Sequence, residues 1–156
     1  KNNESHLKLS TLLKKHDIQR VYLAVASGVI KEDAGRIEAP IGRHPADRKK
    51  MAVNLKNGRH AVTHFKVIER FKSATLIEAR LETGRTHQIR VHMAYIGHPL
   101  VGDMVYGKSK KKYPIEGQAL HAMLLGFVHP RTGEYMEFRA EPPEDFVVLL
   151  EQLRNE

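Results

Sequence analysis

The stretch from residue 81 to residue 107 constrains the fold more than any other part of the chain. An apolar segment runs into Gly84, and a short helix and a glycine-rich loop are expected after it. Thr86 is a suitable N-cap, because its hydroxyl can accept hydrogen bonds from free amides of the first helical turn. Gly97 and Pro99 are matching stop signals, since glycine tolerates a left-handed cap and proline cannot continue a helix.

The start of this predicted helix carries an unusual charge. Arg85 and Arg90 lie just before and within its first turn, where the helix dipole disfavours a cation. Solvated arginines, or a pair with a local acid, would be the ordinary interpretation of either residue alone. Three further polar side chains share the same turn: His87, Gln88 and His92. Together they favour a site that faces an anion, either a phosphate or a carboxylate.

Length and composition limit the class of protein. The chain has 156 residues, enough for one domain with a real core, and its net charge of +8 favours a polyanionic partner. It has no cysteine, which excludes disulfides and thiolate metal sites and suits a reducing cytoplasm. No apolar run approaches the roughly 18 residues needed to span a bilayer.

The remaining pattern predicts an α+β fold, with a mixed, mainly antiparallel sheet and flanking helices. Residues 3–16 have the spacing of an amphipathic helix, and residues 18–27 alternate as a strand, with Tyr22 pointing away from the branched aliphatic face. Further strands are expected at 36–39, 61–71, 75–82 and 134–140, with a hairpin turn at 57–58. Residues 118–127 fit either a helix or a buried strand.

Two helix faces are predicted from apolar spacing. In the central helix the inward residues are Ile89, Met93 and Ile96. In the last helix, which opens at Pro142 and Pro143, they are Phe146, Leu149, Leu150 and Leu153.

Two basic segments are candidates for phosphate contacts. Residues 42–51 combine glycine and proline with four cations, namely Arg43, Arg48, Lys49 and Lys50. Residues 108–112 form a second basic run. Both segments are expected to be exposed loops, and either a solvated loop or contact with an RNA backbone fits the composition.

Other chemistries find little support. His87 and His92 are five residues apart, so they do not share a helix face as paired metal ligands would, and no metal site is predicted. The chain contains neither a serine nucleophile elbow nor a phosphate-cradling glycine loop. A conventional hydrolase or nucleotide triphosphatase is therefore not indicated.

The motif Thr-Gly-Arg-Thr-His-Gln-Ile-Arg-Val-His at 83–92 resembles the RluA/RluD family of pseudouridine synthases. The Gly-His-Pro-Leu-Val-Gly-Asp and Tyr-Gly that follow it strengthen the resemblance. Matching segments extend over essentially the whole chain: Arg-Val-Tyr-Leu-Ala, Ala-Pro-Ile-Gly-Arg, Ala-Leu-His-Ala and His-Pro-Arg-Thr-Gly-Glu. The resemblance implies a pseudouridine synthase fold in which residues 1–156 form a single domain, the C-terminal portion of the catalytic domain.

The family likeness assigns roles to individual residues. It implies that Tyr22 stacks on the target uracil, that Leu120 packs against the base, and that Arg90 pairs with the catalytic aspartate. Arg85, His87 and the four cations of the 42–51 segment become RNA-binding candidates. The implied reaction isomerises uridine to pseudouridine in structured RNA, most often large-subunit ribosomal RNA, and needs neither cofactor nor metal.

One part of the family pattern does not occur in this sequence. The catalytic aspartate of the family lies in a His-Arg-(Leu/Ile)-Asp-x-x-Thr-Ser-Gly motif, which is expected shortly before the segment that opens this chain. We therefore expect the chain to be part of a longer cytoplasmic, monomeric synthase and to be inactive by itself. An RNA-binding module without catalysis, and a basic domain whose arginines are all structural, remain the alternatives.

Overall fold

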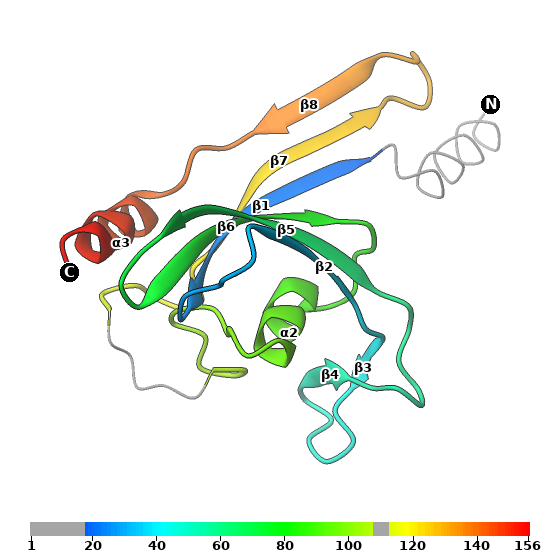
Figure 1. The fold of residues 1–156 in the computed structure, drawn as a ribbon. Coiled ribbons are helices and arrows are strands. Elements are labelled where there is room, and N and C mark those ends of the chain that lie inside the picture. The colour runs from blue at the N-terminus through cyan, green and yellow to red at the C-terminus, as the bar shows by residue number, and fades with distance from the viewer. Residues whose placement is uncertain (1–17, 108–112) are drawn as a thin grey trace.

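A computed structural model describes residues 18–107 and 113–156, in which two sheets and two helices form the regular structure (Figure 1). The elements are β1 (Gln19–Ser27), β2 (Ala34–Glu38), β3 (Ile41–Arg43), β4 (Met51–Val53), β5 (Val62–Arg70), β6 (Ala74–Leu81), α2 (Gln88–Tyr95), β7 (Leu120–Val128), β8 (Tyr135–Arg139) and α3 (Glu144–Arg154). Six strands form the main sheet in the order β2-β5-β6-β1-β7-β8, and every neighbouring pair is antiparallel. The predicted α+β class with a mainly antiparallel sheet is confirmed.

Strand β1 lies in the middle of the sheet and separates the core into two layers. Its alternation is confirmed: Val25 belongs to one buried cluster, whereas Ala24 and Ala26 belong to the cluster on the opposite face. Successive side chains of a strand point to opposite faces, so a single strand can serve both layers. Tyr22 packs against the second cluster, on the side of the small alanines, as its position in the alternation predicts.

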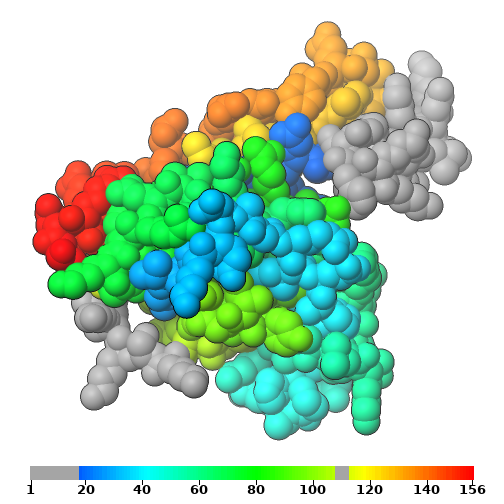
Figure 2. Space-filling model, viewed as in Figure 1, coloured from blue at the N-terminus to red at the C-terminus, as the bar shows by residue number. Residues whose placement is uncertain are grey.

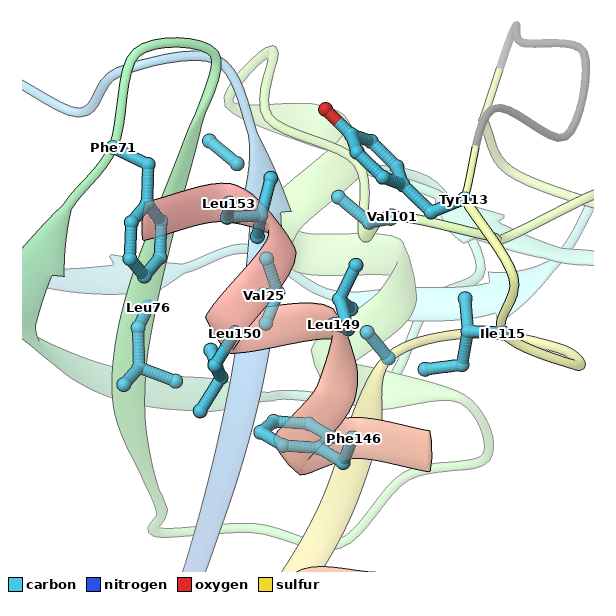
Figure 3. Packing of buried hydrophobic residues seen from close by; sticks show 12 residues of the cluster. Val25, Phe71, Leu76, Val101, Tyr113, Ile115, Phe146, Leu149, Leu150 and Leu153 are labelled. Atoms are coloured by element: carbon cyan, nitrogen blue, oxygen red, sulfur yellow. The ribbon is translucent and has the colours of Figure 1, made fainter. Parts of the chain in front are cut away.

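Helix α3 covers one face of the sheet. Figure 3 shows its buried side chains packed against strand residues that include Val25 and Leu76. The four residues predicted to face inward are the four that the helix buries: Phe146, Leu149, Leu150 and Leu153. Glu144 and Asp145 lie in the first turn, where the helix dipole favours acids.

Helix α2 covers the opposite face. Ile89 and Met93 are buried there beside Ala24 and Ile77, as predicted. Ile96 is 36% exposed, so its predicted inward position is wrong. The helix ends at Tyr95, and the chain then turns away.

The stop signal beyond α2 acts as predicted. Gly97 has φ +90°, a conformation that glycine adopts readily, and its amide donates to the carbonyl of Ala94 at 3.0 Å. The amide of His98 donates to Met93 at 2.8 Å, which closes the helix end.

The strands predicted at 61–71 and 75–82 are β5 and β6, which pair with each other, and β8 lies where the alternation predicted a strand. The ambiguous segment 118–127 is a strand, because β7 pairs with β1 on one side and with β8 on the other. The helix predicted at 3–16 and the basic run at 108–112 lie outside the described residues. A turn occurs near Asn57, but the strands on either side of it belong to different sheets, so the predicted hairpin is wrong.

The small sheet of β3 and β4 forms a lobe beside α2 (Figures 1 and 2). Ile41 of β3 and Val91 of α2 share a buried cluster, against which Met51 and Val53 also pack. The loop between the two strands spans residues 44–50 and is largely exposed, as expected for the first basic segment. The lobe therefore presents its cations next to α2.

Candidate functional site

A pocket of about 280 Å³ opens beside the start of α2. It brings together Tyr22 from β1, Arg90 from α2 and Leu120 from β7, three residues that are far apart in the sequence. Six further side chains complete its lining: Leu81, Arg85, His87, Gln88, Ile89 and Gln118. We call this hollow the Arg90 pocket. Its walls combine an aromatic ring and aliphatic groups with cations and amides.

The first turn of α2 is organised by Gln88 instead of Thr86. Helix α2 begins at Gln88, whose side-chain oxygen accepts from the amide of Arg85 at 3.0 Å and from the Thr83 hydroxyl at 2.7 Å. Its amide nitrogen donates to the carbonyl of Val62 at 2.9 Å. Thr86 is exposed and makes no cap, so the predicted N-cap is wrong: the chain reaches the helix one residue later, through His87.

His87 occupies a strained position. It has φ 55° and ψ 25°, a left-handed conformation that costs energy in residues other than glycine. Its Nδ1 atom is hydrogen-bonded to the hydroxyl of Tyr106 at 2.8 Å. Burial and the nearby charge of Arg90, opposed by Asp103, lower the pKa of His87. The lowered pKa keeps the imidazole neutral near pH 7, and the bond to Tyr106 holds it at the edge of the Arg90 pocket.

His92 does not face an anion, in contrast to the sequence prediction. It is fully buried, its Nε2 atom donates to the carbonyl of Ala39 at 2.9 Å, and its Nδ1 atom lies 2.8 Å from the hydroxyl of Thr63. That hydroxyl also accepts from Gln88 at 2.9 Å. Burial lowers the pKa of His92 despite the bond to Ala39. Gln88 and His92 thus belong to a structural network that ties α2 to the sheet.

Arg90 pairs with an acid of its own chain, which is the ordinary interpretation given above for this residue alone. Arg90 donates from Nε to Oδ2 of Asp103 at 2.9 Å, and from Nη2 to Oδ1 at 3.0 Å. Both partners are buried, with 9% of Arg90 and 1% of Asp103 exposed. Asp103 also accepts from the amides of Val105 and Tyr106, each at 3.0 Å. This geometry fixes the plane of the guanidinium.

The ion pair is strongly held in its charged form. The bond to Asp103 raises the pKa of Arg90 in spite of burial. Burial works to raise the pKa of Asp103, but the bonds from Arg90 and two backbone amides, with the charge of Arg90, outweigh it and lower that pKa. Among the described residues, no hydrogen bond is made by the third guanidinium nitrogen of Arg90, Nη1. Arg90 therefore lines the pocket in a fixed orientation, with Nη1 available for a further hydrogen bond.

Tyr106 connects this ion pair to the β3–β4 lobe. The Arg90 guanidinium lies 4.9 Å from the centroid of the Tyr106 ring, a cation–π contact. The Tyr106 hydroxyl accepts from the amide of Met51 at 3.1 Å and also binds His87. One side chain thus supports two residues of the pocket and one end of the basic loop.

The predicted RNA-binding residues fall into two groups. Arg85 and His87 line the Arg90 pocket, and the Nε atom of Arg85 donates to the carbonyl of His60 at 2.8 Å. The other four belong to the lobe, outside the lining of that pocket: Arg43, Arg48, Lys49 and Lys50. Burial, followed by the charge of Arg59, lowers the pKa of Arg85.

Several residues of the site were not identified from the sequence alone. Asp103 and Tyr106 stand in the Gly-Asp and Tyr-Gly pairs that end the central motif. Both pairs were noted in the sequence, but neither residue was assigned a function. Arg20 is less visible: its guanidinium lies against Gly84, where a side chain would collide with it, and its buried Nε atom has no hydrogen-bond partner among the residues that the structure describes. Gln118 shows no pattern that would mark it.

Neither a metal cluster nor a membrane-spanning helix occurs in residues 18–107 and 113–156. In these ranges, no three His, Cys, Asp or Glu side chains gather as a metal site would require. Over the same part of the chain, no helix is long and apolar enough to cross a membrane.

The comparisons with known proteins agree with the geometry. The family described as RNA pseudouridylate synthase matches residues 1–95. A Bacillus subtilis (strain 168) protein, "Uncharacterized RNA pseudouridine synthase YlyB", is 55% identical over 155 residues, which cover 99% of this chain and 50% of that protein. "Ribosomal large subunit pseudouridine synthase D" of Pseudomonas aeruginosa is 46% identical over 168 residues, 100% of this chain and 52% of that protein.

A solved structure agrees as well. "Human RNA Pseudouridylate Synthase Domain Containing 1" superposes with a TM-score of 0.75 at 27% identity, over 90% of this chain and 60% of that chain. The chain spans about half the length of the curated relatives it matches. By the family match over residues 1–95 and by these relatives, the chain belongs to the RNA pseudouridylate synthase family.

Proposed function

We propose that this chain forms part of an enzyme that isomerises uridine to pseudouridine in structured RNA, most often large-subunit ribosomal RNA. The observation that carries the proposal is the convergence of Tyr22, Arg90 and Leu120 in one pocket. These three residues come from separate elements, and the family resemblance names all three. Relatives of this chain carry the name of ribosomal large subunit pseudouridine synthase D.

In the proposed reaction, each residue of the pocket has a distinct task. The ring of Tyr22 and the side chain of Leu120 offer flat and apolar surfaces for a uracil that has left its stack. A carboxylate attacks C1′ of the ribose and the N1–C1′ glycosidic bond breaks. The base rotates while held, and C5 bonds to C1′ as the carboxylate leaves. C5 then loses its proton and N1 gains one from water, so the product is an isomer of uridine. Arg90 pairs with the carboxylate that attacks the ribose, keeping it ionised and oriented.

The attacking aspartate is proposed to come from a part of the protein outside residues 1–156. The ion pair with Asp103 supports this role for Arg90, because it occupies Nε and Nη2 and leaves Nη1 for a second carboxylate. On this account the chain is the C-terminal portion of a single catalytic domain. No cofactor or metal is required.

RNA binding is assigned to the cations around the pocket. We assign contacts with RNA phosphates to Arg85, to His87 as a neutral hydrogen-bond donor, and to the basic loop. The enzyme is proposed to act as a cytoplasmic monomer.

The test is an isomerase assay with ribosomal RNA transcribed to carry tritium at C5 of uridine. Pseudouridine formation releases that tritium into water, so release measures turnover directly. The longer protein that contains this chain is expected to release tritium, and the 156-residue chain by itself is not. The variant Leu120→Asp, which puts a charge against the base, should stop release. Leu125→Asp, at an exposed position on the same strand, is the matched control.

RNA affinity, measured in parallel, separates the proposal from its alternatives. Salt-dependent RNA binding by the longer protein without tritium release from any ribosomal RNA would indicate a binding module. Absence of RNA binding at low salt would leave a basic domain whose arginines are structural.

A further inference from the structure

A second hollow, of about 340 Å³, lies on the lobe side of α2. We call it the Tyr95 pocket. Its lining comes from the β3–β4 lobe, from α2 and from the loop that follows, and includes His44, Lys50, Val91, Tyr95, Val105 and Tyr106. None of these residues lines the Arg90 pocket, so the hollow has no role in the isomerisation as described.

The two pockets share a wall. Tyr106 lines the Tyr95 pocket, and its hydroxyl binds His87, which lines the Arg90 pocket. The rings of His87 and Tyr106 meet edge to face, with centroids 5.7 Å apart. The two hollows therefore adjoin at this pair of rings.

The floor and rim of the Tyr95 pocket suit a flat ring. Tyr95 is 58% exposed, which is high for an aromatic residue on a helix that is otherwise mostly buried. Val105 is also exposed at this edge, and Val91 closes the bottom as part of the buried cluster under the lobe. An exposed aromatic ring with aliphatic neighbours is the surface on which proteins stack unpaired bases.

The opposite rim supplies positive charge and a hydrogen-bond donor. The Nδ1 atom of His44 accepts from the amides of Ala46 and Asp47, each at 3.0 Å, so its proton lies on Nε2. Lys50 follows at the end of the same loop and lines the pocket beside His44. Asp47 is the only acid in residues 43–50, and its carboxylate accepts from the amide of Lys49 at 3.2 Å. The balance of charge at this rim is positive and fits a phosphate.

The geometry points to a binding site for the nucleotide next to the target uridine. Its base stacks on Tyr95, and its phosphate binds Lys50 and the Nε2–H of His44. The inference rests on the proposed function for RNA as the ligand, and adds to it a second unstacked nucleotide. The site would make turnover depend on the neighbour of the target as well as on the target.

The experiment compares the binding of uridine 5′-monophosphate with that of the dinucleotide UpU, by calorimetry at low salt. The longer protein is expected to bind UpU at least fivefold more tightly, the lower end of what stacking one base contributes. Tyr95→Ala should remove this gain and leave the affinity for the mononucleotide unchanged, whereas Tyr95→Phe, which keeps the ring, should retain it. Because Tyr95 is exposed, neither change is expected to unfold the protein.

Controls separate this inference from the proposed function. Tyr135→Ala, at an exposed tyrosine of β8, should leave both affinities unchanged. Lys50→Ala should weaken UpU binding and reduce its salt dependence by about one charge. Equal weakening of both ligands by Tyr95→Ala, or no effect on either, in an enzyme that still releases tritium would overturn the second site alone.

Other results would assign the pocket differently. A change in sedimentation on Tyr95→Ala, with unchanged UpU affinity, would assign the pocket to a contact between copies and overturn the nucleotide site. Failure of the wild-type protein to bind any of the RNA probes would overturn both this inference and the proposed function.

Discussion

The two faces of the main sheet are built by opposite means. The face under α3 is a continuous apolar cluster, in which the four inward residues of the helix recur at regular spacing. The face under α2 combines an apolar layer with a network of buried polar groups that includes Gln88, His92 and the Arg90–Asp103 pair. The first arrangement serves stability alone. The second also holds a charged side chain at a pocket, and it is there that we place the chemistry.

Removing the charge of Arg90 is the most direct way to test whether the α2 face carries the chemistry. Arg90→Ala in the longer protein is expected to reduce tritium release by about 10³-fold or more, as loss of a charge-stabilising group does in other enzymes. RNA affinity should change by less than about threefold, since a single contact among many is lost. Turnover near the wild-type rate would contradict the role proposed for Arg90.

Because Arg90→Ala leaves Asp103 buried without its partner, a paired variant serves as the control. Arg90→Met combined with Asp103→Asn removes both charges, and the asparagine oxygen can still accept from the amides of Val105 and Tyr106. This double variant should fold and bind RNA but release no tritium.

Breaking the ion pair from the other side should mainly affect stability. Asp103→Asn leaves the Arg90 guanidinium buried beside a neutral amide, and the free energy of unfolding is expected to fall by about 3–5 kcal/mol. Urea denaturation at pH 7 measures this change. Glu137→Gln, at the exposed pair with Arg139, is the control and should cost less than about 1 kcal/mol. Equal effects of the two substitutions would mean that burial of the Arg90 pair is unimportant.

On the α3 face, a cavity should lower stability without affecting chemistry. Leu149→Ala is expected to lower the free energy of unfolding by about 2–5 kcal/mol, because Leu149 is almost fully buried. Turnover at a temperature where the variant is folded should match the wild type. Val148→Ala, at an exposed position on the same helix, should change stability by less than about 0.5 kcal/mol.

The smallest expected effect is a dependence of stability on pH that arises from the α2 face. Burial lowers the pKa of His92, so the unfolded chain binds more protons than the folded one as pH falls through about 6.5. This contribution to stability is present above pH 6.5 and is lost as pH falls toward the folded pKa. His87, whose pKa is also lowered, acts in the same direction.

Substitution isolates the part that His92 plays. Urea denaturation between pH 8 and pH 5 should show a shallower slope for His92→Gln than for the wild type. An unchanged slope in His92→Gln would place the pH dependence elsewhere.

The contrast between the faces also explains what could be predicted from the sequence. The stripe of α3 and the alternation of β1 were readable because apolar burial follows the period of the element. The segment at residues 118–127 was not, because its strand form depends on backbone pairing with β1, a distant partner. Local periodicity carries no information about such partners.

On the α2 face, local rules failed where a long-range polar contact overrode them. Thr86 had the right residue type for a cap, but the side chain of Gln88 satisfies the first turn through contacts that reach the sheet. The charge argument favoured a site that faces an anion, but the anion beside Arg90 is a carboxylate of the same chain, which was the ordinary interpretation of that residue. That anion is Asp103, thirteen residues further along the chain, and only the fold brings the two together. Tyr22, Arg90 and Leu120 were named by family resemblance, and their convergence required the structure.

The most direct test of the central claim is a crystal structure of the longer protein bound to an RNA that carries 5-fluorouridine at the modified position. Fluorine at C5 replaces the proton that must leave, so the reaction should stop with the base in place. The account predicts the uracil ring within about 4 Å of Tyr22 and Leu120. It also predicts a carboxylate within about 3.2 Å of Nη1 of Arg90. A base bound away from Tyr22, or a carboxylate that does not approach Arg90, would contradict it.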